Sequence, residues 1–578
     1  MARIPRDGPR ERDRDREGGT SSECPFQDRV LAEGIQLQSP KPQERAIPNP
    51  GLGGLPQPTF PMLATPSPLQ RRAVWGCMLA VLLVAGLLRL PLLGHLPNGF
   101  FTDEASTGYD AYALLHTGAD QYGVRWPLFA RSVGDYNEAL YRYLAVPSVA
   151  IFGLNEFAVR LPAALAGILT VALLFAVVRE QWGVRVALWA ALLLAISPWA
   201  VPLNRIAFRA NLLPMLFLLG HWALLRAMSR RPAWIYAATL AFGLALVSYS
   251  SARMFVPLYL LGFGVIYRRS LGSIGRPVWM AGGAFLALLL ALSTYWLSSQ
   301  GMARARLLGV QGHWSVVWDY LSYFDPRFLV LQGDRDLCHG LIGWGILGPV
   351  QGGLALAGLG RVVKDWRNPA LRMWVWWLLL YPLPAALAGP GHSLRSIAGA
   401  PAFCLLAALG AVGLMGLAKS RVARVAWIAL LLVGLAQDAG RFAWQYFTDY
   451  PRSGASAWLY GMRELVHEQA AYSGGPIYIS NRIPVPFLFV PFYTAMSPRE
   501  YQALPFLYDD LAKYTGYTMG RFHVIDVAKP GLPEGPCVLT LTAEEAQRYQ
   551  AQWSDSWSVR HEVRHPDGHE LYVLLEHR

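Results

Sequence analysis

Two adjacent acidic residues stand in the segment GFFTDEASTGYDAY (residues 99–112), shortly after a long apolar run. Ionised carboxylates are costly in lipid, so Asp103 and Glu104 belong either to a solvated flank or to a working site. A carboxylate at a membrane surface can act as a general base toward a hydroxyl group within hydrogen-bond reach. Acidic residues are also common at ordinary helix ends, and the choice depends on which side of the membrane they face.

The composition is typical of a protein that crosses a membrane several times. Hydrophobic residues make up 53% of the 578 residues and charged residues only 15%, which is less charge than a soluble protein of this size carries. The formal net charge of +13 does not indicate nucleic-acid binding. The basic residues cluster in short loops between apolar runs, where they act as orientation signals.

The sequence predicts about eleven membrane-spanning helices, because it contains repeated apolar runs of about 20 residues. They are expected at 73–94, 157–178, 184–199, 211–227, 232–249, 254–267, 277–297, 341–360, 372–389, 394–417 and 422–438. One further run, YLAVPSVAIFGL (143–154), has about a dozen residues and a proline, which is short for a crossing helix. Counting it as a crossing would place most basic loops outside, against the positive-inside rule. We therefore expect it to lie along the outer surface.

Three regions follow from this topology. Residues 1–72 are rich in proline, glycine and charge and are expected to form a disordered cytoplasmic tail. Residues 73–438 form the membrane domain, with larger outer loops at 95–156 and 298–340. Residues 439–578 contain a helical opening and several β-like runs, PIYIS, FHVIDV, CVLTLT and ELYVLLEH, which predict a small exocytoplasmic α/β domain.

Four arginines fall in short outer loops, where the positive-inside rule predicts few basic residues. They are Arg205 and Arg209 in NRIAFRAN, Arg253 in SYSSARMFVP, and Arg395 in GHSLRSIAG, which also contains His392. The planar guanidinium group donates two parallel hydrogen bonds and suits phosphate. Arginines that face a carboxylate at the interface would suit a lipid-linked phosphate, whereas each arginine alone could equally anchor a helix end.

Further polar residues of the two large outer loops are candidates for contacts with substrate or acceptor. They are Tyr109, Asp135 and Glu138 in the first loop, and Asp334, Asp336 and His339 in the second. The second group has the spacing D-x-D-x-x-H, which could hold a metal or contact a sugar. The same spacing is common in a polar turn that caps the next helix.

Several motifs, in order along the chain, resemble those of the GT-C membrane glycosyltransferases. They are TDE, VRLPAALAGILTVALLFAVVRE, GVRVALWAALLLAISPWAVPLNRIAFRAN, YLSYFDPRFLVLQGDRDLCHG and GHSLRSIAGAPAF. Within that group the chain is most similar to bacterial relatives of the dolichyl-phosphate-mannose–protein mannosyltransferases. Lipid A aminoarabinose transferase and the oligosaccharyltransferases are more distant. The resemblance covers roughly residues 73–420.

The resemblance implies a fold, a reaction and a place in the cell. It implies inverting transfer of a hexose or pentose from a polyprenyl-phosphate donor to a hydroxyl of a glycan, lipid or protein, at the outer face of the bacterial plasma membrane. Asp103 would be the catalytic base, with Glu104 as second candidate. The leaving phosphate is negatively charged and needs cations, which Arg205, Arg209, Arg253, Arg395 and His392 could supply.

One position departs from the pattern of some relatives. They carry an aspartate where this chain has Asn211, and a neutral amide is a poorer ligand for a divalent ion than a carboxylate. We therefore expect no bound metal and no cofactor, although a divalent cation is not excluded by the residues. Two other functions stay open: a transporter or flippase for lipid-linked sugars, and a non-catalytic scaffold. The sequence shows no inverted repeat of the kind that transporters carry.

Overall fold

The computed structural model describes residues 68–132, 136–302, 315–505, 516–529, 535–549 and 556–577. These residues belong to one unit that spans 60–578. The expectation for the N-terminal tail lies almost entirely outside the described residues. Asp135 and part of the loop at 298–340 also lie outside them.

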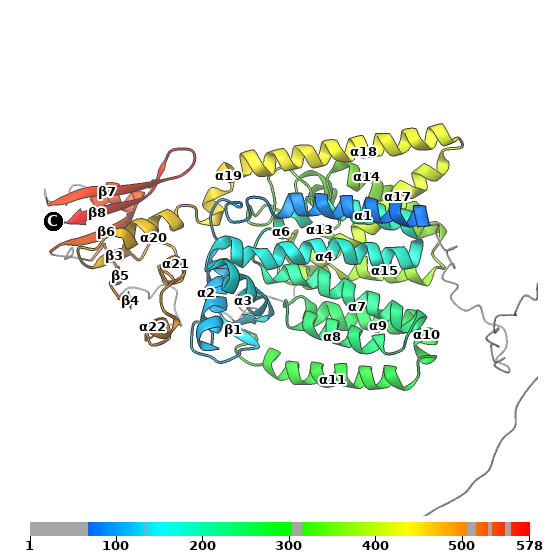
Figure 1. Ribbon diagram of the computed structural model, residues 1–578, viewed down its shortest axis with the longest axis horizontal. Helices are drawn as coiled ribbons and strands as arrows, with labels where there is room; N and C mark the ends of the chain where they lie inside the picture. Colours follow the sequence, from blue (N-terminus) through cyan, green and yellow to red (C-terminus); the bar gives the residue numbers. More distant parts are fainter. Residues whose placement is uncertain are drawn as a thin grey trace, which may run out of the picture. The chain divides into compact units, whose positions relative to one another are not determined.

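The core of the unit is a bundle of apolar helices (Figure 1). Each of the eleven expected spans overlaps a helix: α1 (Pro68–Arg89), α4 (Glu156–Trp182), α5 (Val184–Ala195), α7 (Leu212–Ser229), α8 (Trp234–Leu246), α9 (Ala252–Ile266), α11 (Arg276–Trp296), α14 (Pro349–Lys364), α15 (Pro369–Leu380), α17 (Ala400–Leu417) and α18 (Arg421–Trp444). Among the described residues, six helices are long and apolar enough to cross a membrane. The others are shorter, so eleven crossings remain a prediction.

Small residues allow two of these helices to pack closely. A Cβ atom on Gly358 of α14 would lie 2.1 Å from the carbonyl oxygen of Leu406, and one on Gly410 of α17 would lie 2.0 Å from that of Leu354. Only glycine fits at both positions, because a side chain would meet the backbone of the opposite helix. Such contacts between small residues are typical of helix pairs in membranes.

The first large loop forms a folded cap at one end of the bundle. It contains α2 (Thr102–Thr117), the short hairpin β1 (Phe129–Arg131) and β2 (Tyr136–Glu138), and α3 (Leu140–Phe152), which includes most of the ambiguous run 143–154. Figure 1 shows this cap at the end of the bundle opposite α10 (Arg268–Gly272). The acidic loop and one of the basic loops therefore lie at opposite ends, as the predicted topology requires.

The C-terminal region is a small α/β domain, as predicted. Its sheet has the strand order β4-β5-β3-β6-β8-β7, with β3 parallel to β5 and β6 and the other pairs antiparallel. The strands are β3 (Ile477–Ser480), β4 (Thr518–Met519), β5 (Phe522–Ile525), β6 (Cys537–Thr542), β7 (Trp557–Arg564) and β8 (Glu570–His577), and the helices are α20 (Met462–Ala471), α21 (Pro486–Tyr493), α22 (Pro498–Gln502) and α23 (Ala543–Tyr549). All four predicted β-like runs form strands.

The C-terminal domain is attached to the cap through polar contacts. Arg463 forms an ion pair with Glu156 at 2.5 Å, and the Tyr493 hydroxyl donates a hydrogen bond to the same carboxylate at 2.9 Å. The backbone N–H of Phe100 donates to the carbonyl oxygen of Trp458 at 2.8 Å. The segment that leads into α2 is therefore held on one side by the C-terminal domain.

Candidate active site

Glu104 fixes the first turn of α2 in place. Its two carboxylate oxygens each accept a hydrogen bond from Arg160 of α4 at 2.9 Å. The same carboxylate accepts the backbone N–H of Ala207 at 2.8 Å and that of Phe101, the residue before α2, at 3.2 Å. Both charged side chains are fully buried. This bidentate pair therefore joins the first loop, α4 and the segment around residue 207.

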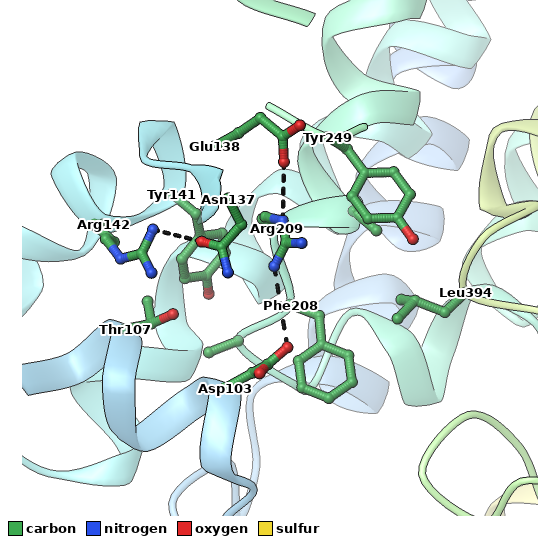
Figure 2. Close-up of a pocket in the computed structure, with 12 residues that line it drawn as sticks. Asp103, Thr107, Asn137, Glu138, Tyr141, Arg142, Phe208, Arg209, Tyr249 and Leu394 are labelled. Carbon is green, nitrogen blue, oxygen red and sulfur yellow. Dashed lines mark hydrogen bonds and ion pairs between the residues drawn. The ribbon is translucent and has the colours of Figure 1, made fainter. Parts of the chain in front are cut away.

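The neighbouring residue Asp103 has the opposite environment. Its side chain is 37% exposed and its carboxylate lies 4.0 Å from Nη1 of Arg209. Figure 2 shows that Asp103 and Arg209 face one another across a pocket. The two acids are adjacent in the sequence, but successive helix positions point in different directions. One is therefore buried as a structural anchor, and the other is open to a ligand.

The pocket has a volume of about 410 Å³, including its open mouth. Its walls come from α2, the end of the β1–β2 hairpin, α3, and segments near residues 207, 249 and 394. The lining residues are Asp103, Thr107, Asn137, Glu138, Tyr141, Arg142, Ala207, Phe208, Arg209, Ala210, Tyr249 and Leu394. Carboxylates, guanidinium groups and aromatic rings meet in one site, which is a combination suited to a polar ligand.

Glu138 balances the charge of two arginines beside the pocket. It accepts a hydrogen bond from Nε of Arg209 at 3.1 Å and one from Nη2 of Arg253 at 2.9 Å. Burial raises the pKa of Glu138, but the two guanidinium groups lower it more, so the net shift is downward and Glu138 is ionised near neutral pH. The Arg209 guanidinium also lies over the ring of Tyr249, 5.7 Å from its centroid.

One donor of Arg209 is left unused by these contacts. Among the described residues, its buried Nη2 has no hydrogen-bond partner. The side chain is only 11% exposed, and a buried N–H without a partner costs about 1–3 kcal/mol. The Arg209 guanidinium can therefore donate a further hydrogen bond to a ligand such as an anion or a hydroxyl group.

A buried ion pair supports the wall behind Asp103. Arg142 of α3 contacts the Asp110 carboxylate at 2.5 Å and donates to the side-chain oxygen of Asn137 at 2.7 Å. Burial raises the pKa of Asp110 to about 6, against the opposing effect of Arg142. These three residues connect α2, the hairpin and α3, so they set the width of the pocket.

Arg205, a predicted phosphate ligand, and Asn211, which stands where some relatives carry an acid, both lie outside the pocket. Arg205 is buried, donates to the carbonyl oxygens of Leu88 and Pro91, and does not line the pocket. Asn211 is also buried, and its amide donates to the carbonyl oxygens of Leu203 and Ile206. Both side chains satisfy backbone groups inside the bundle, which is a structural role. The amide of Asn211 is therefore not directed at the Asp103 pocket.

Tyr109 and Arg395 are not among the residues that line the pocket. The Tyr109 hydroxyl donates to the carbonyl oxygen of Met496 at 3.0 Å, which links α2 to the C-terminal domain. Arg395 donates to the carbonyl oxygen of Ala388 at 2.7 Å, next to the pocket residue Leu394. Asp135 lies outside the described residues.

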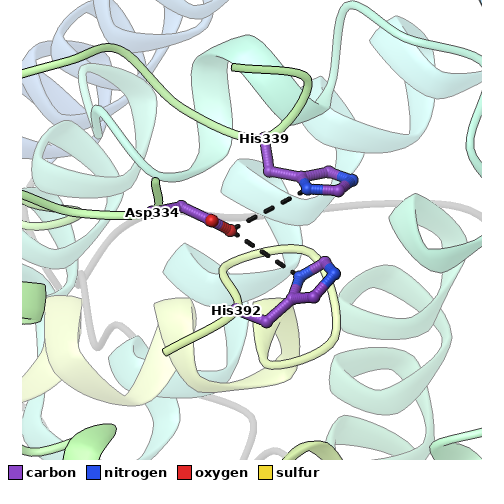
Figure 3. Close-up of side chains that lie close together, drawn as sticks. All are labelled: Asp334, His339 and His392. Carbon is purple, nitrogen blue, oxygen red and sulfur yellow. Dashed lines mark ion pairs between the residues drawn. The ribbon is translucent and has the colours of Figure 1, made fainter. Parts of the chain in front are cut away.

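Asp334, His339 and His392 come together in a second group of side chains (Figure 3). Their possible ligand atoms lie within 4.8 Å of one another, so they could hold a metal ion. Asp336 is half exposed and contacts His339 Nδ1 at 3.1 Å, and this contact lowers the pKa of Asp336. This group is close to the pocket, because the rings of His339 and the pocket residue Phe208 are 6.0 Å apart.

Several residues that build the site do not stand out in the sequence. Arg160 and Arg142 lie inside the apolar and aromatic runs VRLPAAL and YRYLAVP, although an arginine inside such a run is expensive and signals a buried partner. Glu104 is a possible base by its position, but its complete pairing with Arg160 does not favour that role. Thr107 and Asn137 carry no signal beyond their place in the first loop.

Comparison with known proteins agrees with the resemblance that the motifs predicted. Residues 139–296 match the family described as dolichyl-phosphate-mannose-protein mannosyltransferase. Two Bacillus subtilis (strain 168) proteins are similar over this part of the chain. "Putative mannosyltransferase YycA" is 31% identical over 156 residues, 26% of this chain and 23% of that protein. The similarly named YkcB is 28% identical over 155 residues, 26% and 20% of the two chains. The matches therefore span less than a quarter of each relative.

Solved structures share the fold over most of the chain. ArnT from Cupriavidus metallidurans in the apo state has a TM-score of 0.52 at 14% identity and covers 88% of this chain and 97% of its own. The same protein bound to undecaprenyl phosphate has a TM-score of 0.50, also at 14% identity, with 88% and 98% covered. The apo oligosaccharyltransferase of Archaeoglobus fulgidus has a TM-score of 0.50 at 13% identity, with 88% and 75% covered. The chain has the GT-C fold of these membrane proteins, and its segment 139–296 is similar to mannosyltransferases.

Proposed function

We propose that this protein is an inverting glycosyltransferase that moves a sugar from a polyprenyl-phosphate donor to an acceptor hydroxyl at the outer face of the membrane. One observation carries the proposal: a partly exposed carboxylate, Asp103, faces a guanidinium group with an unused donor, Arg209, in a single pocket. The reaction requires a base and a cation in the same site, and these two residues could supply them.

The proposed reaction balances in one displacement. The acceptor oxygen attacks the anomeric carbon of the donor sugar, and its proton passes to the Asp103 carboxylate. The bond between that carbon and the phosphate oxygen breaks, and the polyprenyl phosphate leaves with the bonding electrons. A guanidinium group that binds the leaving phosphate stabilises the charge that develops on it. Attack from the side opposite the leaving group inverts the anomeric configuration.

Arg209 is the first candidate for the phosphate contact, because it lines the pocket and has a donor to spare. Arg253 shares Glu138 with Arg209 and is the second candidate. Arg395 and His392 lie on the segment that contributes Leu394 to the pocket, and they remain candidates for the rest of the donor. Arg205 is the weakest candidate, because it already donates to backbone carbonyl oxygens.

Similarity to known proteins supports the choice of donor. ArnT, which shares the fold, has been solved with undecaprenyl phosphate, and the matching family is named for a dolichyl-phosphate-mannose reaction. A polyprenyl-phosphate hexose or pentose is therefore the proposed donor. The proposed setting is the bacterial plasma membrane, and the acceptor is a glycan, lipid or protein.

Transfer from a panel of radiolabelled polyprenyl-phosphate sugars tests the proposal. The purified full-length chain should release polyprenyl phosphate and label an acceptor with at least one donor. Asp103→Asn keeps the shape and removes the base, so turnover should fall by roughly 10²–10⁴-fold while donor binding persists. A fully active Asp103→Asn variant would contradict the assignment of the base. Donor binding and movement across vesicles without any transfer would favour the transporter alternative.

A further inference from the structure

Asp334, His339 and His392 form a compact group from two distant segments of the chain. Oδ2 of Asp334 lies 3.9 Å from Nδ1 of His339 and 3.7 Å from Nδ1 of His392. The two imidazole rings are 4.4 Å apart between centroids. The side chains of the three residues are 6%, 11% and 18% exposed, respectively. In Figure 3 both Nδ1 atoms point toward the same carboxylate oxygen.

The distances from Asp334 to the two histidines fit a shared ion better than direct hydrogen bonds. Contacts of 3.7 and 3.9 Å are too long for an N–H···O hydrogen bond, which spans about 2.7–3.2 Å. Ligand atoms that bind one zinc ion at about 2.0–2.2 Å lie roughly 3.3–3.8 Å from each other when the angles between bonds are tetrahedral or wider. The group therefore leaves room for an ion among the three atoms, and a small adjustment of the side chains would bring each into bonding range.

Neighbouring groups hold the carboxylate in a defined orientation. Oδ2 of Asp334 accepts the backbone N–H of Ser393 at 2.7 Å. The Ser393 hydroxyl lies 3.0 Å from the same oxygen and 2.8 Å from the carbonyl oxygen of His339. Oδ1 accepts the backbone N–H of Asp336 at 3.0 Å. Each carboxylate oxygen offers about two lone-pair sites. When the Ser393 hydroxyl donates to its shorter partner, the carbonyl oxygen of His339, Oδ2 keeps one site for an ion. Hydrogen bonds of this kind orient the ligands of metal sites.

We propose that Asp334, His339 and His392 bind a zinc ion that fastens the second large loop to the segment 391–396. Two imidazoles and a carboxylate are common zinc ligands, and a fourth position could be taken by water or by Asp336, whose Oδ2 is 3.1 Å from His339 Nδ1. The ion would stabilise the wall of the pocket, because the ring of His339 neighbours that of the pocket residue Phe208 and the segment 391–396 contributes residue 394 to the same wall.

The proposed zinc site is separate from the metal site that some relatives could form with an acid at the position of Asn211. An amide in place of an aspartate weakens the case for a metal held jointly with Asp103. Neither residue belongs to the present group, and Asn211 is committed to backbone carbonyl oxygens. His392 is the one residue that the zinc group shares with the candidates for donor binding, so zinc content, and not transfer activity, tests the zinc proposal.

Zinc content of the purified full-length protein, carrying no histidine tag, tests the proposal. After loading with zinc and removal of the excess, the wild-type chain should retain about one ion by mass spectrometry, as a single three- or four-ligand site binds. His339→Ala and His392→Ala should lose it. Ser393→Ala removes a hydroxyl that lies 3.0 Å from the Asp334 carboxylate and 2.8 Å from the carbonyl oxygen of His339, and it keeps all three proposed ligands. It should weaken zinc binding by about 10–100-fold without abolishing it.

A matched control comes from the other candidate group among the described residues, His565, Asp567 and His569 on the β7–β8 turn. His569→Ala should leave the zinc content unchanged. Loss of zinc in His569→Ala but not in His392→Ala would overturn the proposal. If the alanine variants do not fold, the wild-type chain can be tested by competition for zinc with a chromophoric chelator. Failure of the wild-type chain to take up zinc in that competition would also overturn the zinc proposal.

Discussion

At the scale of single residues, the two carboxylates in the first turn of α2, Asp103 and Glu104, lie in different environments. Glu104 is buried and paired in bidentate fashion with Arg160, whereas Asp103 is 37% exposed and faces the pocket. A buried pair of this kind fixes geometry rather than performing chemistry. The exposed member is the one that a substrate can reach. Positioning of Asp103 therefore depends on its neighbour.

We predict that Glu104→Gln destabilises the protein while Asp103→Asn does not. Removing one charge leaves Arg160 buried without its counter-ion, which costs about 3–5 kcal/mol in free energy of unfolding. Thermal unfolding in detergent should show a clear loss for Glu104→Gln and almost none for Asp103→Asn. Equal unfolding temperatures for the two variants would contradict the anchoring role of Glu104.

We predict that Arg209→Ala weakens binding of a polyprenyl-phosphate sugar. A hydrogen bond to a charged group contributes about 1.5–3 kcal/mol, which corresponds to roughly 10–150-fold in affinity. Arg209→Lys should restore only part of this, because the ammonium group lacks the planar fork. Affinity is measured by displacement of a labelled donor.

Arg441 of α18 provides the matched control for this measurement. Its side chain is exposed and does not line the pocket, so Arg441→Ala removes an equal charge and should bind the donor normally. Equal affinities of Arg209→Ala and Arg441→Ala would show that Arg209 does not contact the donor phosphate.

At the scale of helices and strands, apolar periodicity predicted much of the fold. All eleven expected spans overlap helices and all four β-like runs form strands. The spacing of apolar residues that predicts a helix or a strand can be read within a short stretch of sequence. The pairing of Glu104 with Arg160 could not be predicted, since it depends on contact between residues 56 positions apart. The same limit explains why Arg205 resembles a phosphate ligand in the sequence: its carbonyl partners lie 117 and 114 positions away.

The helix α2 also packs against the C-terminal domain. We predict that this packing leaves no room for a larger residue at Gly108. A Cβ atom on Gly108 would lie 2.6 Å from Phe492 of α21 and 2.6 Å from Val159 of α4. Gly108→Ala should therefore shift α2 and lower transfer activity, and overpacking of this kind costs about 1–3 kcal/mol. Gly440→Ala in α18 is the control, because nothing lies within 4 Å of its added Cβ. Equal activity and stability of the two variants would show that α2 tolerates displacement.

At the scale of the whole molecule, the proposed reaction requires that the pocket and the C-terminal domain face the same side of the membrane. Contacts of Glu156 with Arg463 and Tyr493 join the start of α4 to the C-terminal domain, and the contact of Tyr109 with Met496 joins α2, which lines the pocket, to the same domain. The basic residues of α10 lie at the other end of the bundle (Figure 1). The positive-inside rule favours a cytoplasmic position for this second end, which supports the proposed outer position of Asp103.

We predict that single cysteines report this orientation in intact cells. In a background without the five native cysteines, Arg499→Cys places an exposed thiol on α22, and Arg231→Cys places one between α7 and α8. A membrane-impermeant maleimide should label the first in intact cells and the second only after permeabilisation. The charge distribution across the bundle makes the opposite orientation unfavourable, because each basic loop would have to cross the membrane during insertion. The reverse labelling pattern would place Asp103 in the cytoplasm, where a lipid-linked donor exposed at the outer face could not reach it.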